Sequence, residues 1–265
     1  CTYATIALLD ILIRLAHSRR DVKDPVSTPR SPFRRVVALT GVMGVAALGA
    51  VALPQAATAA PTTFHVSNLT DADPGSFRDA VLQANANPGL DTIVFDVTGS
   101  VTLLVSGITI TDGVIIQGAG STINRAFDGD VLTVNLAGGT PTADRVFETS
   151  FLSMNGAGGL GRAITVLATV PLESMALENA TIANFDGADR GGAVRVEALT
   201  GGFTTDAVTF SGNTAVGTAS NDNGGAVSLD SVGGPIQVAN TLFEGNEAHR
   251  GGGLAILSSP SSAIT

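Results

Sequence analysis

The sequence predicts an all-β protein whose main domain is a right-handed parallel β-helix, a β-solenoid, with a short N-terminal capping helix. Three observations support this fold class. Similar segments recur near the C-terminal end, each combines short apolar strands with Gly- and Asn-rich corners, and no amphipathic helix occurs within them. The composition agrees, because 32 of the 265 residues are Gly and only 14% are charged. The right-handed form is expected, since parallel crossovers are overwhelmingly right-handed.

The recurring segment consists of a strand that contains Phe, an Asn three residues later, and a glycine pair that begins a second strand. Its members are Phe210, Asn213, Gly224 and Gly225 in one copy and Phe243, Asn246, Gly252 and Gly253 in the next. The two phenylalanines are 33 residues apart, and the glycine pairs in this alignment are 28 apart. An upstream copy has Ile182 at the Phe position, followed by a glycine pair at Gly191. A period of this length indicates a repeat architecture.

Each repeat unit has an apolar face that only stacking can bury. Val208 and Phe210 alternate with Thr209, which is the period expected of a strand with one buried face. Stacked coils, about 4.8 Å apart, bury these faces jointly. We expect the glycine pairs at corners that need a positive φ or a close backbone approach. Asn213 and Asn246 are expected at strand ends, where Asn tolerates the left-handed region and its amide can bond to the identical amide of the next layer.

Residues 60–97 are expected to form the N-terminal cap of the solenoid, which occupies residues 98–265. Ser76 suits the start of a helix over residues 77–86, whose apolar residues share one face: Phe77, Val81 and Ala84. Such a helix would cover the unpaired strands and the core at the open end. At roughly 20 to 33 residues per coil, residues 91–265 provide about six to eight coils. Since no cap follows the last coil, we expect the solenoid to be C-terminally incomplete.

Residues 30–59 have the features of a secretory signal peptide. Arg34 and Arg35 supply the charge, an apolar run covers residues 36–53, and Ala-Thr-Ala at its end fits a cleavage site. The alternative is a transmembrane anchor, because a run of about 18 residues could just span a bilayer. Residues 1–29 are predicted to be a non-native or disordered extension, with a membrane-surface helix as the alternative. We therefore expect a secreted or cell-surface protein of the cell envelope or outer membrane, without a membrane span in its mature segment.

The negative charge of the chain limits the classes of partner that it is expected to bind. From Ala60 onward the sequence has 7 Arg, no Lys and 20 Asp plus Glu, which gives a formal charge of −13. Such a surface repels nucleic acid and anionic lipid, so we expect neither as a partner. The single Cys is Cys1, so no disulfide is expected in the mature segment.

Two stretches resemble a known family. The pattern Phe-x-x-Asn followed by Gly-Gly-Ala-(Ile/Leu/Val), complete in residues 210–227, resembles the repeat of polymorphic outer-membrane proteins and related autotransporter adhesin-like proteins of pectin-lyase-like fold. In the last copy, Leu254 takes the Ala position of this alignment. Residues 66–85 are similar to the N-terminal segment of secreted β-helix proteins, with Phe77 for its Leu and Val81 for its Ile. The resemblance implies structural roles for these residues in an adhesin-like binding or structural rod.

The alternative to an adhesin-like rod is an enzyme. It would be a polysaccharide lyase or glycoside hydrolase acting on extracellular uronate-containing glycans. The candidate residues are Asp186 and Asp189, as paired carboxylates, and Arg190, as a uronate-binding cation. A solvated corner explains the same residues, so we assign no catalytic residue. No cofactor is expected, with weak calcium binding at the Asp186 and Asp222 corners as the alternative. The G-x-G-x-x-G sequence at residues 156–161 precedes an expected strand instead of a helix, so we predict a loop there and no phosphate site.

The function predicted from the sequence is therefore that of an exported, non-catalytic surface or secreted protein. An extracellular glycan or a cell-surface protein is its expected partner, and the chain is expected to be a monomer.

Overall fold

The computed structural model describes residues 60–157, 159–217 and 223–258, all within the unit Pro54–Thr265. The predicted extension at residues 1–29 and the predicted signal peptide at residues 30–59 lie outside the described residues. Within the described ranges the protein is all-β apart from the helix α2 (Phe77–Ala86) and the short 3-10 helix η1 (Thr142–Asp144).

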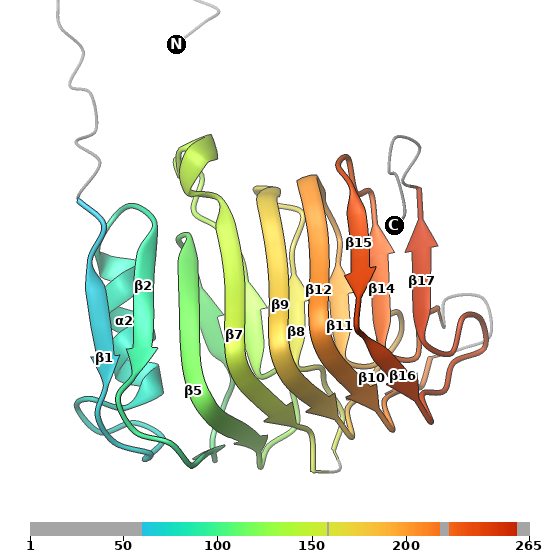
Figure 1. The fold of residues 1–265 in the computed structure, drawn as a ribbon, viewed down its shortest axis with the longest axis horizontal. Coiled ribbons are helices and arrows are strands. Elements are labelled where there is room, and N and C mark those ends of the chain that lie inside the picture. Colours follow the sequence, from blue (N-terminus) through green and yellow to red (C-terminus); the bar gives the residue numbers. More distant parts are fainter. Residues whose placement is uncertain (1–59, 158, 218–222, 259–265) are drawn as a thin grey trace, which may run out of the picture. The chain divides into compact units, whose positions relative to one another are not determined.

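The strands form two long parallel sheets and one small one (Figure 1). The first sheet contains β1 (Thr63–Val66), β2 (Asp91–Phe95), β3 (Ser100–Leu103), β5 (Val114–Arg125), β7 (Val146–Asn155), β9 (Leu172–Ala183), β12 (Leu199–Ser211), β15 (Ile236–Ala239) and β16 (Leu242–Glu244). The second contains β4 (Ile108–Ile110), β6 (Leu132–Val134), β8 (Ile164–Val166), β11 (Val194–Val196), β14 (Val227–Asp230) and β17 (Leu254–Leu257). The small sheet pairs β10 (Asp186–Gly187) with β13 (Thr214–Ala215).

From β3 onward the chain visits the first and second sheets alternately, and each strand pairs in parallel with the strand of the preceding circuit. Figure 1 shows the successive circuits side by side, from β5 to β17. This connectivity is compatible with a β-solenoid. The predicted all-β, parallel fold class is thus confirmed at this level.

The core lies between the two long sheets and consists of columns of apolar side chains. One column contains Ile123, Met154, Ile182, Phe210 and Phe243, which the parallel registers place on successive strands. The rings of Phe210 and Phe243 are stacked, with centroids 5.1 Å apart and planes inclined by 9°. The sequence-based expectation that these two phenylalanines occupy one column is confirmed.

Helix α2 begins where the sequence predicts. Ser76 is its N-cap, and the Ser76 hydroxyl accepts a hydrogen bond of 3.2 Å from the backbone N–H of Asp79. The apolar face of the helix is buried in the core next to β1, β2 and β4: Phe77, Ala80, Val81 and Ala84. The Phe77 ring lies 5.4 Å from that of Phe95, so the helix packs directly against the first strands.

The glycine pairs have both roles that the sequence suggests. Gly224 has a φ of +72°, which disfavours a side chain, whereas a Cβ on Gly225 would collide with the carbonyl oxygen of Gly252 in the next coil. The last copy corrects our alignment. Because Val227 pairs with Leu254, Gly251 lies opposite Gly224, and the aligned pair is Gly251 and Gly252, not Gly252 and Gly253. Gly253 therefore takes the Ala position that we had given to Leu254.

The asparagines form the expected ladder. The Asn213 amide nitrogen donates hydrogen bonds of 2.9 Å to the Asn246 amide oxygen and to the Ile182 carbonyl. Neither asparagine has a positive φ, however. The left-handed conformation falls on the preceding residues, Gly212 and Gly245, each with a φ of +60°. The glycine makes the turn, and the asparagine links the layers.

Candidate functional site

The candidate catalytic corner is held together by ion pairs within the chain. The Asp189 carboxylate contacts the guanidinium groups of Arg162 and Arg195, the latter at 3.2 Å. Arg190 donates a hydrogen bond of 2.7 Å to the carboxylate of Asp230. Asp186 lies in β10 and pairs with the next coil, and its backbone carbonyl accepts a hydrogen bond from a neighbouring loop. Asp189 and Arg190 are thus bound to different partners.

Arg162 is the buried centre of this corner, and the sequence analysis did not identify it. Its Nε donates to the carbonyls of Arg190 and Gly191, at 3.0 and 2.8 Å, and so fixes the backbone at the end of the candidate segment. Burial lowers the pKa of Arg162, while the nearby Asp130 and Asp189 carboxylates oppose this shift. The carboxylates compensate a buried cation, which is a structural task.

A second buried arginine organises the G-x-G-x-x-G segment. Arg125 is 2% exposed, donates to the carbonyls of Gly129, Gly156 and Gly159, and lies 5.2 Å from the centroid of the Phe185 ring. The segment is followed by the strand β8, not by a helix. The described residues of the segment, 156–157 and 159–161, lie outside the helices and strands, as predicted for a loop, and the carbonyls of Gly156 and Gly159 accept hydrogen bonds from a cation of the chain itself.

Metal ligands are not concentrated anywhere in the described ranges, where no three His, Cys, Asp or Glu side chains gather in a group that could hold a metal ion. Asp222, which belongs to the calcium alternative, lies outside the described residues.

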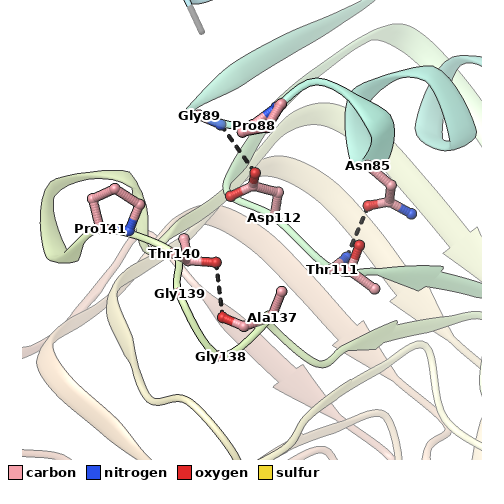
Figure 2. A pocket seen from close by; sticks show the side chains of 10 residues that line it. All are labelled: Asn85, Pro88, Gly89, Thr111, Asp112, Ala137, Gly138, Gly139, Thr140 and Pro141. Atoms are coloured by element: carbon pink, nitrogen blue, oxygen red, sulfur yellow. Dashed lines mark hydrogen bonds between the residues drawn. The ribbon is translucent and has the colours of Figure 1, made fainter. Parts of the chain in front are cut away.

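A hollow of about 320 Å³ lies beside the C-terminal end of α2 (Figure 2). Three of its polar side chains are engaged with the backbone. Asn85 accepts a hydrogen bond of 2.8 Å from the N–H of Thr111, and Asp112 accepts one of 2.9 Å from the N–H of Gly89. Thr140 donates to the carbonyl of Ala137. These bonds tie the helix end to the adjacent loops, and the side chains are committed to that task.

The first sheet presents a different kind of surface. In the strands β3, β5, β7, β9 and β12, buried residues alternate with outward residues, and the outward residues align across the coils in two rows. We call these rows the polar face. One row contains Ser100, Thr122, Ser153, Thr181 and Thr209, and the other contains Thr102, Asn124, Asn155, Ala183 and Ser211. Every side chain in these two rows is uncharged, whereas β16 continues the rows in the next coil with Leu242 and Glu244.

The middle of the polar face is hollowed. A depression of about 380 Å³ is lined by outward residues of β5, β7 and β9, by the buried Met154 and by the corner residue Asn184. The outward residues are Thr122, Ser153, Asn155, Thr181 and Ala183. The Ser153 hydroxyl accepts a hydrogen bond of 3.0 Å from the N–H of Thr181, and the Asn155 amide oxygen accepts one of 3.0 Å from the Asn184 side chain. These contacts orient the polar groups of adjacent coils.

An exposed aromatic residue lies at the edge of the polar face. Phe151, two residues before Ser153, is 54% exposed and has a φ of +53°, which is an outlier for a bulky residue. The next coils place Asn179, Ala207 and Asn240 at the same corner, also with positive φ. Opposite Phe151, the register of β5 is interrupted between its pairs with β7, at residues 118–120.

Beyond this corner several outward side chains are acidic, among uncharged ones such as Ser150, Ala176 and Thr204. Glu178 and Asp206 occupy equivalent positions on β9 and β12, directly before the corner, and Glu148 lies on β7. Burial raises the pKa of Glu148, and the nearby Glu178 carboxylate raises it further. The corner thus separates the two uncharged rows from a surface that carries three carboxylates.

The sequence analysis did not find the polar face or Phe151. The signal was the repeated polar-apolar-polar triplet in the strands, as in Thr122-Ile123-Asn124 and Ser153-Met154-Asn155. The pairing of the strands is needed to show that these triplets form one continuous surface.

Comparison with models of known protein families and with curated proteins finds no match for this chain. Among the described residues, no helix is both long and apolar enough to cross a membrane.

Proposed function

We propose that this protein is an exported, non-catalytic right-handed parallel β-helix, capped by α2, that acts as an adhesin-like binding rod at the cell surface or outside the cell. The observation that carries the proposal is the polar face, which offers aligned hydroxyl and amide groups on a regular scaffold. Such groups both donate and accept hydrogen bonds, and their hydroxyl groups are weak nucleophiles unless a general base activates them. The polymorphic outer-membrane protein resemblance and the predicted signal peptide agree with this role.

The ion pairs around Asp189 favour a binding function over catalysis. A glycoside hydrolase needs one carboxyl group as an acid and a second as a base or nucleophile beside the substrate. Asp189 is held by Arg162 and Arg195, so a substrate would have to compete with two guanidinium groups of the chain. The buried Arg162 would then lose a compensating charge.

The proposal is tested with the purified chain on immobilised glycans and on whole cells. We expect binding without release of unsaturated uronates or of reducing ends. If the parent cleaves a glycan and Asp186→Ala or Asp189→Ala abolishes the cleavage, the function is that of a lyase or hydrolase and the proposed binding function is refuted. Binding to neither glycans nor cells would also refute the proposed function.

A further inference from the structure

We propose that the polar face is a docking site for a neutral polysaccharide chain, and that Phe151 is its stacking platform. The inference rests on the proposed function and specifies the ligand class, the surface and the residue that contributes most to affinity. Three independent properties of the described residues support it: the hydrogen-bonding chemistry of the face, its charge, and the strained corner at Phe151.

The hydrogen-bonding chemistry matches a sugar chain. A sugar hydroxyl donates one hydrogen bond and accepts others, and Ser, Thr and Asn side chains have the same dual capacity. The rows repeat from coil to coil about every 4.8 Å, so an extended polymer meets equivalent groups on successive coils. The hollow between Thr122, Ser153 and Thr181 provides concave contact along this path.

The charge excludes a uronate or sulfated polymer as the preferred ligand. No guanidinium, ammonium or imidazole group is present among the outward side chains of the polar face to pair with a carboxylate or sulfate. Desolvating an anion on such a surface is costly. Glu178 and Asp206, across the corner, add repulsion at short range. A neutral glycan avoids both costs.

The corner at Phe151 supplies the aromatic group. A non-Gly residue in the left-handed region typically costs about 1–3 kcal/mol and persists where the surroundings or the function require it. Asn occupies the same corner in two other coils, so the fold does not need an aromatic residue there. The irregularity in β5 at residues 118–120, opposite Phe151, interrupts the regular pairing of that corner, and such bulges commonly re-aim side chains. An exposed ring beside hydroxyl groups can stack on the apolar face of a sugar ring.

The test is a titration of the purified full chain with neutral hexasaccharides of glucose, xylose and mannose and, in parallel, with a hexasaccharide of galacturonate. We expect one or more neutral hexasaccharides to bind and the galacturonate hexasaccharide to bind at least about tenfold more weakly at low ionic strength. Phe151→Asn should weaken neutral binding about fivefold or more. The matched control is Leu82→Asn, which removes a similarly exposed apolar side chain from α2 and should leave binding unchanged.

A second variant probes the hydroxyl rows. The double substitution Thr122→Val and Thr181→Val keeps the shape of both side chains and removes two hydroxyl groups from the hollow. It should also weaken neutral binding, and melting temperatures no lower than that of the parent in all variants show that weaker binding does not come from unfolding. The inference is overturned if galacturonate binds as tightly as the neutral sugars, or if Phe151→Asn and the double variant bind like the parent. Binding to a cell-surface protein alone would refute the ligand class and leave the proposed function standing, whereas absence of any binding would refute both.

Discussion

The asparagine ladder provides the sharpest test of the repeat. Asn213 is fully buried, and its amide makes three side-chain hydrogen bonds. It accepts from the N–H of Phe185 and donates to the Ile182 carbonyl and the Asn246 amide, and so links three coils. Asn213→Ala removes all three bonds at a site that water does not reach.

The expected cost follows from these contacts. Each bond contributes about 1 kcal/mol, and a buried group left unpaired costs about 1–3 kcal/mol. We therefore expect Asn213→Ala to lower the free energy of unfolding by about 3–4 kcal/mol. Asn246→Ala also removes amide contacts, but Asn246 is only half-buried, so water can replace them and the cost should be about 1–2 kcal/mol.

Urea denaturation followed by far-UV circular dichroism measures both variants, and the comparison between them is decisive. Equal costs for the two substitutions, or a cost below about 1 kcal/mol for Asn213→Ala, would show that the ladder does not link the layers as argued.

Three further predictions concern other parts of the fold. Phe151→Asn should raise the free energy of unfolding by about 1 kcal/mol, because Asn tolerates the positive φ better than Phe; a lower urea midpoint would contradict this. Gly225→Ala should destabilise the protein by at least about 2 kcal/mol in thermal melts, or prevent folding, because the added Cβ would collide with a carbonyl of the next coil. The control Gly138→Ala should be neutral in the same melts, because no atom lies within 4 Å of the added Cβ. Glu148→Gln should stabilise the protein at pH 7, because burial and Glu178 raise the folded-state pKa of Glu148 above its ordinary value of 4.5. The gain in the free energy of unfolding should vanish once the pH falls below 4.5, because Glu148 is then protonated in both the folded and the unfolded state. A gain that persists at pH 3.5 would refute the electrostatic explanation.

Local spacing was enough to predict the kind of fold. The alternation around Phe210 and Phe243, and their separation of 33 residues, already placed both side chains in one buried column. The N-cap at Ser76 predicted the start of α2 for a similar reason, since capping involves only neighbouring residues. These inferences hold because strand period and helix capping are short-range properties.

The sequence did not predict the register of a strand where two alignments fit equally well. The run Gly251-Gly252-Gly253 fits the glycine pair in either of two ways, and only the pairing of Leu254 with Val227 selects one. Two partners in the candidate corner were beyond prediction for a different reason: Arg162, which contacts Asp189, and Asp230, which contacts Arg190, are more than 25 residues away in the chain.

By itself, the sequence determined which side chains point inward and which outward in each strand, because that alternation is a property of a single extended segment. Only the tertiary structure decided which outward side chains share a surface. The coils differ in length, so Thr122, Ser153 and Thr181 align only after backbone hydrogen bonding between coils has fixed the register. The same pairing sets the left-handed corner that exposes Phe151, and a candidate binding surface arises from residues that no regular sequence period connects.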